Sequence, residues 1–183
     1  MNAEFFKIDF ILNNPINLLT LPKIRGYLGH QFKDNPWFHQ HQDNKVLYRY
    51  PFIQYKVLNN HLTLLGLQEG AQTLQKVCSQ IKEFHLDNEQ TLYVKATHTN
   101  HYFFNPKPLK TYTIYQFLTP YFALNKKNYQ TFQNLSTMAQ KKEFFNKILT
   151  GNILSFLKSL SIWVESQIIV DIFLEKSQII TFK

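Results

Sequence analysis

The order of hydrophobic patterns in the first 97 residues limits the fold more than any other feature of this 183-residue chain. Runs rich in aromatic and β-branched residues predict β-strands, and apolar residues at every third or fourth position predict α-helices. The predicted elements are a strand at 3–12, a helix at 16–33, strands at 46–58 and 61–66, a helix at 68–85 and a strand at 90–97. This β-α-β-β-α-β order is typical of a ferredoxin-like domain.

Short local signals set the ends of these elements. Proline is tolerated in the first turn of a helix, so Pro22 predicts that the first helix begins near Leu21. Asn59-Asn60 lies between two strand-like runs and predicts a two-residue hairpin turn. Pro51 predicts a break, a bulge or a sheet edge within 46–58, and the polar residues 34–45 before it predict a loop.

The second half of the chain repeats this pattern incompletely. The sequence predicts a connector at 98–110, a strand at 111–118, a short basic helix at 125–134, a helix at 139–160, and a β-hairpin made of 167–174 and 178–182. These elements describe a second ferredoxin-like domain without its last helix and strand. The predicted fold is therefore α+β, with tandem ferredoxin-like (βαββαβ) domains at 1–97 and 98–183, the second incomplete at its C-terminus.

Positive charge is concentrated in the middle of the chain. The whole chain has 20 Lys and Arg against 12 Asp and Glu, a net charge of +8, and residues 98–147 hold 7 Lys against one Glu. Such an excess favours a polyanionic partner such as nucleic acid. The predicted phosphate contacts in this basic segment are Lys107, Lys110, Lys126 and Lys127.

Composition also predicts where the protein works. The single cysteine, Cys78, excludes a disulfide framework within the chain, and charged residues interrupt the first apolar run, so no signal peptide is expected. These features predict a cytoplasmic protein. No stretch approaches 18 uncharged apolar residues, and we expect no membrane span and no membrane partner.

The chemically reactive side chains lie in the segment after the first predicted helix, which reads WFHQHQDNK over 37–45 and is followed by Tyr48. Imidazoles titrate near neutral pH, so one histidine can accept a proton while another donates one. RNA supplies its own nucleophile, the 2′-hydroxyl, and needs only a base, an acid and a cation to be cut. His39, His41, Tyr48 and Lys45 supply these groups, so we expect neither a metal nor another cofactor.

Two other interpretations fit the same residues. The histidines can be solvated loop side chains whose aromatic neighbours enter the core. His39, His41 and Asp43 also match part of the His-X-His-X-Asp-His metal motif of the metallo-β-lactamase fold, although Asn44 stands where that motif has its last histidine. A metallohydrolase that uses these three residues is therefore the less favoured alternative.

Longer segments of the chain resemble a known family. They are IRGYLG at 24–29, FHQHQDNKVLYRYPFIQYKV at 38–57, LGLQEGA at 65–71, NPK at 105–107 and ILTGNILSFLKSLSIWVE at 148–165. Together they resemble the b-type subgroup of CRISPR-associated endoribonucleases that process guide RNA. The resemblance implies a tandem ferredoxin-like fold and metal-independent cleavage of CRISPR repeat precursor RNA by 2′-hydroxyl attack.

The resemblance also implies functions for individual residues. The family's catalytic histidines and tyrosine fall on His39, His41 and Tyr48, and we expect His41 to be the base, His39 its partner, and Tyr48 an acid or a group that positions the phosphate. Apart from the resemblance, the basic side chains of Arg25, Lys45 and Arg49 are expected RNA contacts because of their charge.

One departure from the family concerns the C-terminal end. Family members end with a glycine-rich loop, whereas this chain has no glycine after Gly151, so we expect a truncated end. A non-catalytic RNA-binding protein of the same fold is the resulting alternative. An unfinished second sheet would also expose a strand edge, which favours a homodimer.

Overall fold

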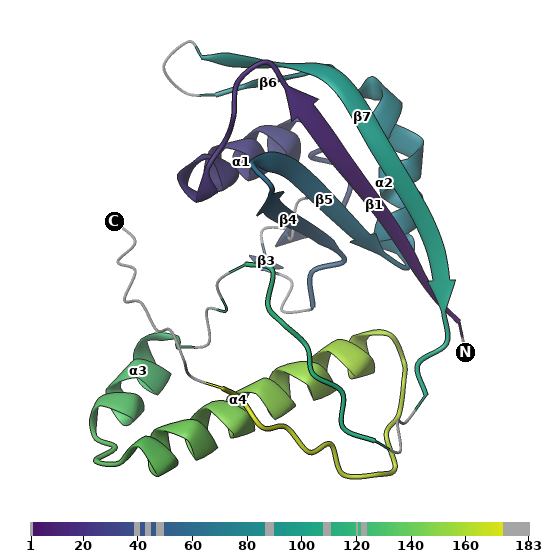
Figure 1. The fold of residues 1–183 in the computed structure, drawn as a ribbon. Helices are drawn as coiled ribbons and strands as arrows, with labels where there is room; N and C mark the ends of the chain where they lie inside the picture. The colour runs from purple at the N-terminus through teal and green to yellow at the C-terminus, as the bar shows by residue number, and fades with distance from the viewer. Residues whose placement is uncertain are drawn as a thin grey trace. The chain divides into compact units, whose positions relative to one another are not determined.

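The computed structural model describes residues 2–38, 50–86, 90–107, 111–119, 121 and 124–173, and the backbone alone of 41–42 and 45–46. The chain divides into two compact units, Met1–Thr119 and Pro120–Lys183. Figure 1 shows a curved sheet with helices α1 and α2 in the first unit, and helices α3 and α4 in the second.

A five-stranded antiparallel sheet forms the N-terminal unit. In spatial order its strands are β4 (Ile53–Leu58), β5 (His61–Leu67), β1 (Ala3–Leu12), β7 (Thr91–Phe104) and β6 (Glu83–His85). Strand β1 is central and pairs with both β5 and β7, as the first strand of a ferredoxin-like sheet does. The β-α-β-β-α-β order predicted for this half of the chain is therefore confirmed.

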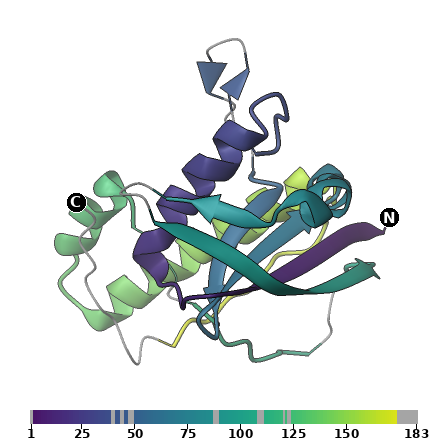
Figure 2. The ribbon, with the colours of Figure 1, turned by 90° about the horizontal axis from the view of Figure 1, so that it is seen from above.

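Helices α1 (Leu21–Gln31) and α2 (Glu69–Val77) cover one face of this sheet (Figures 1 and 2). Alternate residues of β1 point toward the helices, because successive side chains of a strand face opposite sides. Phe6, Ile8 and Phe10 are at most 6% exposed, and they share one core cluster with side chains of both helices. Burial of each such side chain contributes about 1.5–3 kcal/mol to folding.

Two predictions from local sequence, the start of α1 and the turn between β4 and β5, are confirmed. Helix α1 begins at Leu21, with Pro22 in its first turn. Asn59 and Asn60 form the turn between β4 and β5, with φ values of 50° and 61°. Both residues therefore adopt the left-handed conformation that a two-residue type I′ turn requires, which asparagine tolerates well.

The predicted helix at 68–85 was wrong in its second half. Helix α2 ends at Val77, a short 3₁₀ turn (η2, Cys78–Gln80) follows, and Glu83–His85 form β6. Ile81 and Phe84 are buried as their spacing suggested, but they enter the core from an extended segment. The reason is a non-local partner: β7 offers its edge to β6, and strand pairing there replaces a further helical turn.

The segment before β4 also differs from the prediction. His41–Gln42 (β2) and Lys45–Val46 (β3) pair in a small hairpin where a loop was expected. Strand β4 begins only at Ile53, so the predicted strand 46–58 is interrupted around Pro51, as its missing N–H suggested.

The predicted connector at 98–110 was wrong for residues 98–104. Strand β7 continues to Phe104, because β1 offers a pairing partner along this whole stretch, from Ala96 opposite Ile11 to Phe104 opposite Ala3. The strand thus runs past residue 97, and the domain division proposed at 97/98 stays a prediction.

Helices α3 (Lys126–Gln133) and α4 (Met138–Ser159) of the C-terminal unit confirm the two helices predicted there. The side chain of Asn125 accepts the N–H of Asn128 at 2.8 Å and caps α3. Thr137 and Gln140 form a reciprocal capping box at the start of α4. None of the described helices is both long enough and apolar enough to cross a membrane.

The predicted strand at 111–118 does not form, and neither does the predicted strand at 167–174 over residues 167–173, the part of it that the structure describes. Tyr112, Ile114 and Tyr115 of the first segment are instead 83%, 86% and 79% exposed. An alternating pattern predicts a strand only where a neighbouring edge satisfies its backbone hydrogen bonds, and the described residues supply none here. The predicted strand at 178–182 lies outside the described residues.

Candidate active site

The predicted catalytic residues belong to the segment between α1 and β4. His39, Asp43, Tyr48 and Arg49 lie outside the described residues, as does Lys110. His41 lies on β2 opposite Val46, and Lys45 lies on β3 opposite Gln42, but their side chains are outside the described set. The assignments to these residues therefore stay predictions, and the structure describes how the two ends of the segment are held.

The N-terminal end of this segment is a compact turn that follows α1. Phe32 closes the helix by donating its N–H to the Leu28 carbonyl at 2.9 Å. The side chain of Asn35 then accepts the N–H of Trp37 at 3.0 Å. Phe38, only 4% exposed, stacks on Phe32 with ring centroids 4.7 Å apart. The chain is thus fixed up to the residue before His39.

The C-terminal end of the segment packs against its N-terminal end. The rings of Trp37 and Phe52 stack with centroids 5.1 Å apart and planes 14° from parallel. The Phe52 carbonyl accepts the N–H of Leu67 at 2.8 Å, which ties this C-terminal end to the end of β5. The intervening segment 38–51 therefore starts and ends at one ring stack.

Two glycines make this arrangement possible by leaving space. A Cβ atom at Gly70 would overlap the carbonyl oxygen of Phe52 and lie 2.7 Å from its carbonyl carbon. A Cβ atom at Gly66 would lie 2.7 Å from the Cα of Ala71. The first turn of α2, strand β5 and the backbone of Phe52 therefore pack in direct contact, which gives the LGLQEGA segment a structural reason.

Two tyrosines, Tyr50 and Tyr55, lie near the N-terminal end of β4. Gln54 donates a hydrogen bond to the Tyr50 hydroxyl at 3.2 Å, but burial outweighs this contact and raises the pKa of Tyr50. Burial also raises the pKa of Tyr55 far above its usual value, and the charge of Arg25 opposes that shift. Arg25, a predicted RNA contact, is exposed on α1, and its effect on the pKa of Tyr55 indicates that it lies near β4.

The Tyr55 hydroxyl is fully shielded from solvent and has no hydrogen-bond partner among the residues that the structure describes. A buried hydroxyl without a partner is uncommon in folded proteins and destabilises them.

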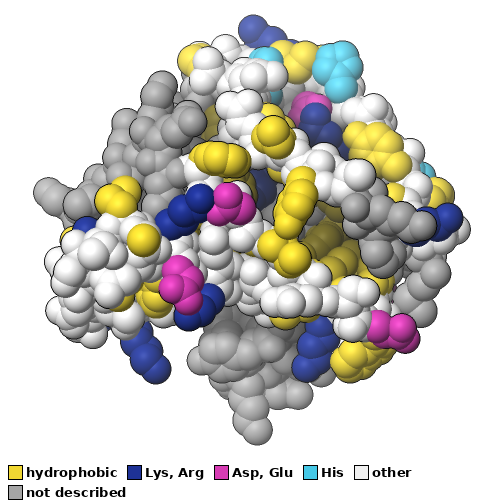
Figure 3. All heavy atoms as spheres, turned by 60° about the horizontal axis from the view of Figure 1, so that its bottom comes forward, with side chains coloured by type: hydrophobic (Ala, Val, Ile, Leu, Met, Phe, Trp, Pro, Cys, Tyr) yellow, Lys and Arg dark blue, Asp and Glu magenta, His cyan; other side chains and the backbone are white. Residues whose placement is uncertain are grey.

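The predicted basic contacts are only partly described. Lys107 is exposed after β7, and Lys126 and Lys127 are exposed in the first turn of α3. Other lysines of the C-terminal unit are paired: Lys142 with Asp171 at 2.6 Å, and Lys147 with Glu143 at 2.7 Å. Figure 3 shows such mixed charge, with basic and acidic side chains side by side on one face.

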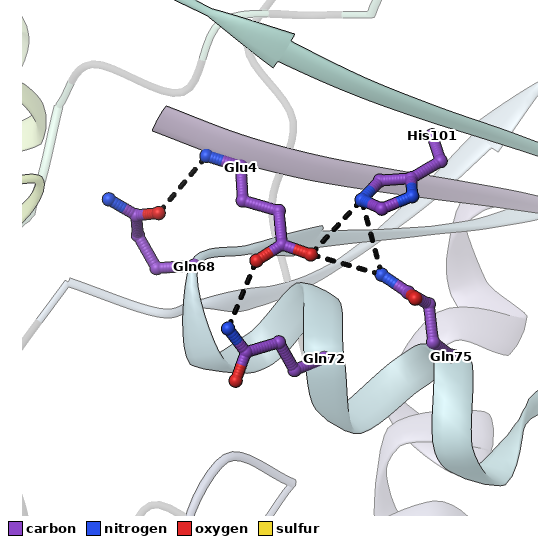
Figure 4. Close-up of polar contacts among 5 residues, drawn as sticks. All are labelled: Glu4, Gln68, Gln72, Gln75 and His101. Atoms are coloured by element: carbon purple, nitrogen blue, oxygen red, sulfur yellow. Dashed lines mark hydrogen bonds and ion pairs between the residues drawn. The ribbon is translucent and has the colours of Figure 1, made fainter. Parts of the chain in front are cut away.

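A polar cluster that the sequence analysis missed joins β1, α2 and β7 (Figure 4). The carboxylate of Glu4 accepts hydrogen bonds from Gln72 at 3.0 Å and Gln75 at 3.1 Å, and it lies 3.0 Å from Nε2 of His101. Burial would raise the pKa of Glu4, but these contacts outweigh it and lower that pKa. The spacing of Gln68, Gln72 and Gln75 fits one face of a helix, and it was the available signal for this cluster.

Gln68 ties the same cluster to the start of the chain. Its side chain accepts the N–H of Glu4 at 3.0 Å, and its own N–H donates to the Glu4 carbonyl at 3.0 Å. It does so with φ 49° and ψ −122°, a conformation that favours glycine.

No three metal-binding side chains gather within the described part of the chain. The alternative metal site at His39, His41 and Asp43 falls on side chains outside that part, so this hypothesis is left to experiment.

Comparisons with known proteins match both halves of the chain. The Cas6b N-terminal domain model matches residues 1–102, and the Cas6b C-terminal domain model matches residues 107–183. A solved structure described as "Crystal structure of Cas6b" is 30% identical with a TM-score of 0.82, and the match covers 91% of this chain and 76% of that one. This likeness gives the chain an α+β fold of the tandem ferredoxin-like type.

Two further relatives extend the comparison. The solved structure described as "Crystal structure of CRISPR RNA processing endoribonuclease Cas6b" is 26% identical with a TM-score of 0.67, over 91% of this chain and 73% of that one. An uncharacterized protein of Methanocaldococcus jannaschii is 46% identical over 54 residues. That match covers 30% of this chain and only 36% of the relative.

Proposed function

The chain belongs to the Cas6b family, and we propose from this premise that it is an endoribonuclease that cuts CRISPR repeat precursor RNA into guide RNAs. The observation that supports the proposal most is the consecutive match of both Cas6b domain models, which leaves only residues 103–106 between them. The net charge of +8 suits a polyanionic substrate. The proposed partner is therefore the repeat RNA itself.

The proposed reaction needs no metal ion. His41 takes the proton of the 2′-hydroxyl, whose oxygen attacks the neighbouring phosphorus. The bond from phosphorus to the 5′-oxygen breaks, and His39 or Tyr48 returns a proton to that oxygen. The products are a 2′,3′-cyclic phosphate and a 5′-hydroxyl, while Lys45, Arg49 and Arg25 stabilise the charge on the phosphate.

The test uses the full chain and a panel of CRISPR repeat RNAs. In EDTA, we expect one cut per repeat and a 2′,3′-cyclic phosphate on the upstream product. A repeat with a 2′-deoxy sugar at the scissile position should bind and resist cleavage. His41→Ala should slow single-turnover cleavage about 100-fold or more, the usual contribution of a general base.

Each other outcome supports a different interpretation. RNA binding by both the wild type and His41→Ala, with no product from either, would support a non-catalytic RNA-binding protein. Stoichiometric zinc and loss of cleavage in EDTA would support the metallohydrolase. Light scattering with and without RNA tests the predicted homodimer.

A further inference from the structure

We infer that Trp37, Phe52 and Gly70, here named the loop clamp, are positioning residues that set the geometry of the catalytic segment 39–49. The inference rests on the proposed function, and it adds residues to which neither the sequence pattern nor the comparisons give a part in the reaction. None of the three carries a group that transfers protons. Their effect on the reaction would be indirect, through the two ends of the segment.

A ring stack joins the two ends of the catalytic segment. Trp37 precedes His39 by two residues, and Phe52 follows Arg49 by three. Their rings lie 14° from parallel with centroids 5.1 Å apart, an offset-stacking distance at which aromatic rings attract each other beyond the effect of area burial. Joining the two ends at one point restricts the conformations open to the segment between them.

The backbone of Phe52 is held by β5 and α2. Its carbonyl is held by the N–H of Leu67 at 2.8 Å, and its backbone touches the Cα hydrogens of Gly70 closely enough that no side chain fits there. Gly70 belongs to the first turn of α2, which packs on β5. The clamp is therefore supported by the regular structure of the N-terminal unit.

A methyl group at residue 70 would displace the backbone of Phe52 or of α2. The new Cβ would lie 2.7 Å from the Phe52 carbonyl carbon, whereas carbon atoms prefer about 3.5 Å or more, so one of them must move by about 0.8 Å. Proton transfer needs heavy atoms within about 2.6–3.2 Å. A misplacement of about 1 Å reduces rates about 100-fold.

The experiment compares Gly70→Ala with Gly151→Ala in the full chain. Gly151 lies in α4, and a methyl group added there would meet none of the described atoms within 4 Å, so its substitution is the matched control. We expect Gly70→Ala to lower the single-turnover rate at saturating repeat RNA at least about 30-fold. Its RNA dissociation constant should stay within about threefold of the wild type, and Gly151→Ala should match the wild type in both measurements.

A second pair of variants avoids any change to the backbone. Phe52→Leu removes the ring and should lower the rate, whereas Phe52→Tyr keeps the ring and should restore it. This pair decides the inference if Gly70→Ala fails to fold. Histidine ring NMR gives a readout apart from activity: the signals of His39 and His41 should shift in Phe52→Leu and stay unchanged in Phe52→Tyr.

The outcomes separate the two hypotheses. No cleavage by the wild type would refute the proposed function, and unchanged His39 and His41 signals in Phe52→Leu would then refute the clamp as well. Wild-type cleavage matched by Gly70→Ala and Phe52→Leu would overturn the inference alone. Loss of melting temperature and RNA affinity, with the rate per bound RNA unchanged, would show a purely structural contribution and would also overturn it.

Discussion

Replacing Tyr55 by phenylalanine should make the N-terminal unit more stable. The Tyr55 hydroxyl is buried and finds no partner among the described side chains and backbone, so folding removes it from water without a replacement hydrogen bond. The cost of an unsatisfied buried polar group is about 1–3 kcal/mol. The raised pKa keeps this phenol neutral at pH 7, and a neutral hydroxyl costs less to bury than a charged group, so we take the lower end and expect a gain of about 1 kcal/mol.

Urea unfolding followed by tryptophan fluorescence measures this change. The chain has two tryptophans, so a Trp163→Phe background leaves Trp37 of the N-terminal unit as the reporter. With a urea m-value of about 2 kcal/mol/M, the midpoint should rise by about 0.5 M at constant slope. Tyr112→Phe is the control and should change nothing, because Tyr112 is 83% exposed. A drop of the midpoint in Tyr55→Phe would show that the hydroxyl has a partner and would refute the reasoning.

Two further predictions concern the polar cluster and the helix caps. The pKa of Glu4 is lowered in the folded state, so its contribution to stability is present above the unfolded pKa and is lost as pH falls through the folded one. Glu4→Gln should therefore destabilise the unit at pH 7 and flatten the acid side of its stability profile; an unchanged profile would contradict the assigned contacts. Thr137→Ala removes the capping box of α4 and should cost about 1 kcal/mol in thermal or urea unfolding of the C-terminal unit. Thr137→Ser keeps the hydroxyl, and equal losses in both variants would exclude the cap as the cause.

Elements with local signals could be predicted from the sequence. The repeat of apolar residues in α4, the turn at Asn59-Asn60 and Pro22 at the start of α1 each depend on neighbours in the chain. The prediction failed where pairing with a distant segment determines the secondary structure. Residues 98–101 read HTNH and carry no burial signal, yet they belong to β7 because β1 lies beside them.

The candidate site divides in the same way. Residue types and their resemblance to a family pointed to His39, His41 and Tyr48, since the chemistry belongs to the side chains themselves. The contacts around Phe52 could not be predicted, because Trp37 and Gly70 meet it from segments that are separate in the sequence. No periodicity links these three positions, and only the fold brings them together.

Glu4 and Gln68 form two hydrogen bonds with each other, so residues near the N-terminus support the turn that precedes Gly70. Gln68 keeps a backbone conformation that costs about 1–3 kcal/mol, and it stands two residues before Gly70. Removing residues 1–4, or pulling on them with a rigid N-terminal fusion, would take away both hydrogen bonds between Gln68 and the backbone of Glu4 and leave Gln68 only its bonds within the first turn of α2. The backbone at Gln68 would then relax toward a less strained conformation. Because Gly70 follows in the same helical turn and contacts Phe52, the position of Phe52 would change as well.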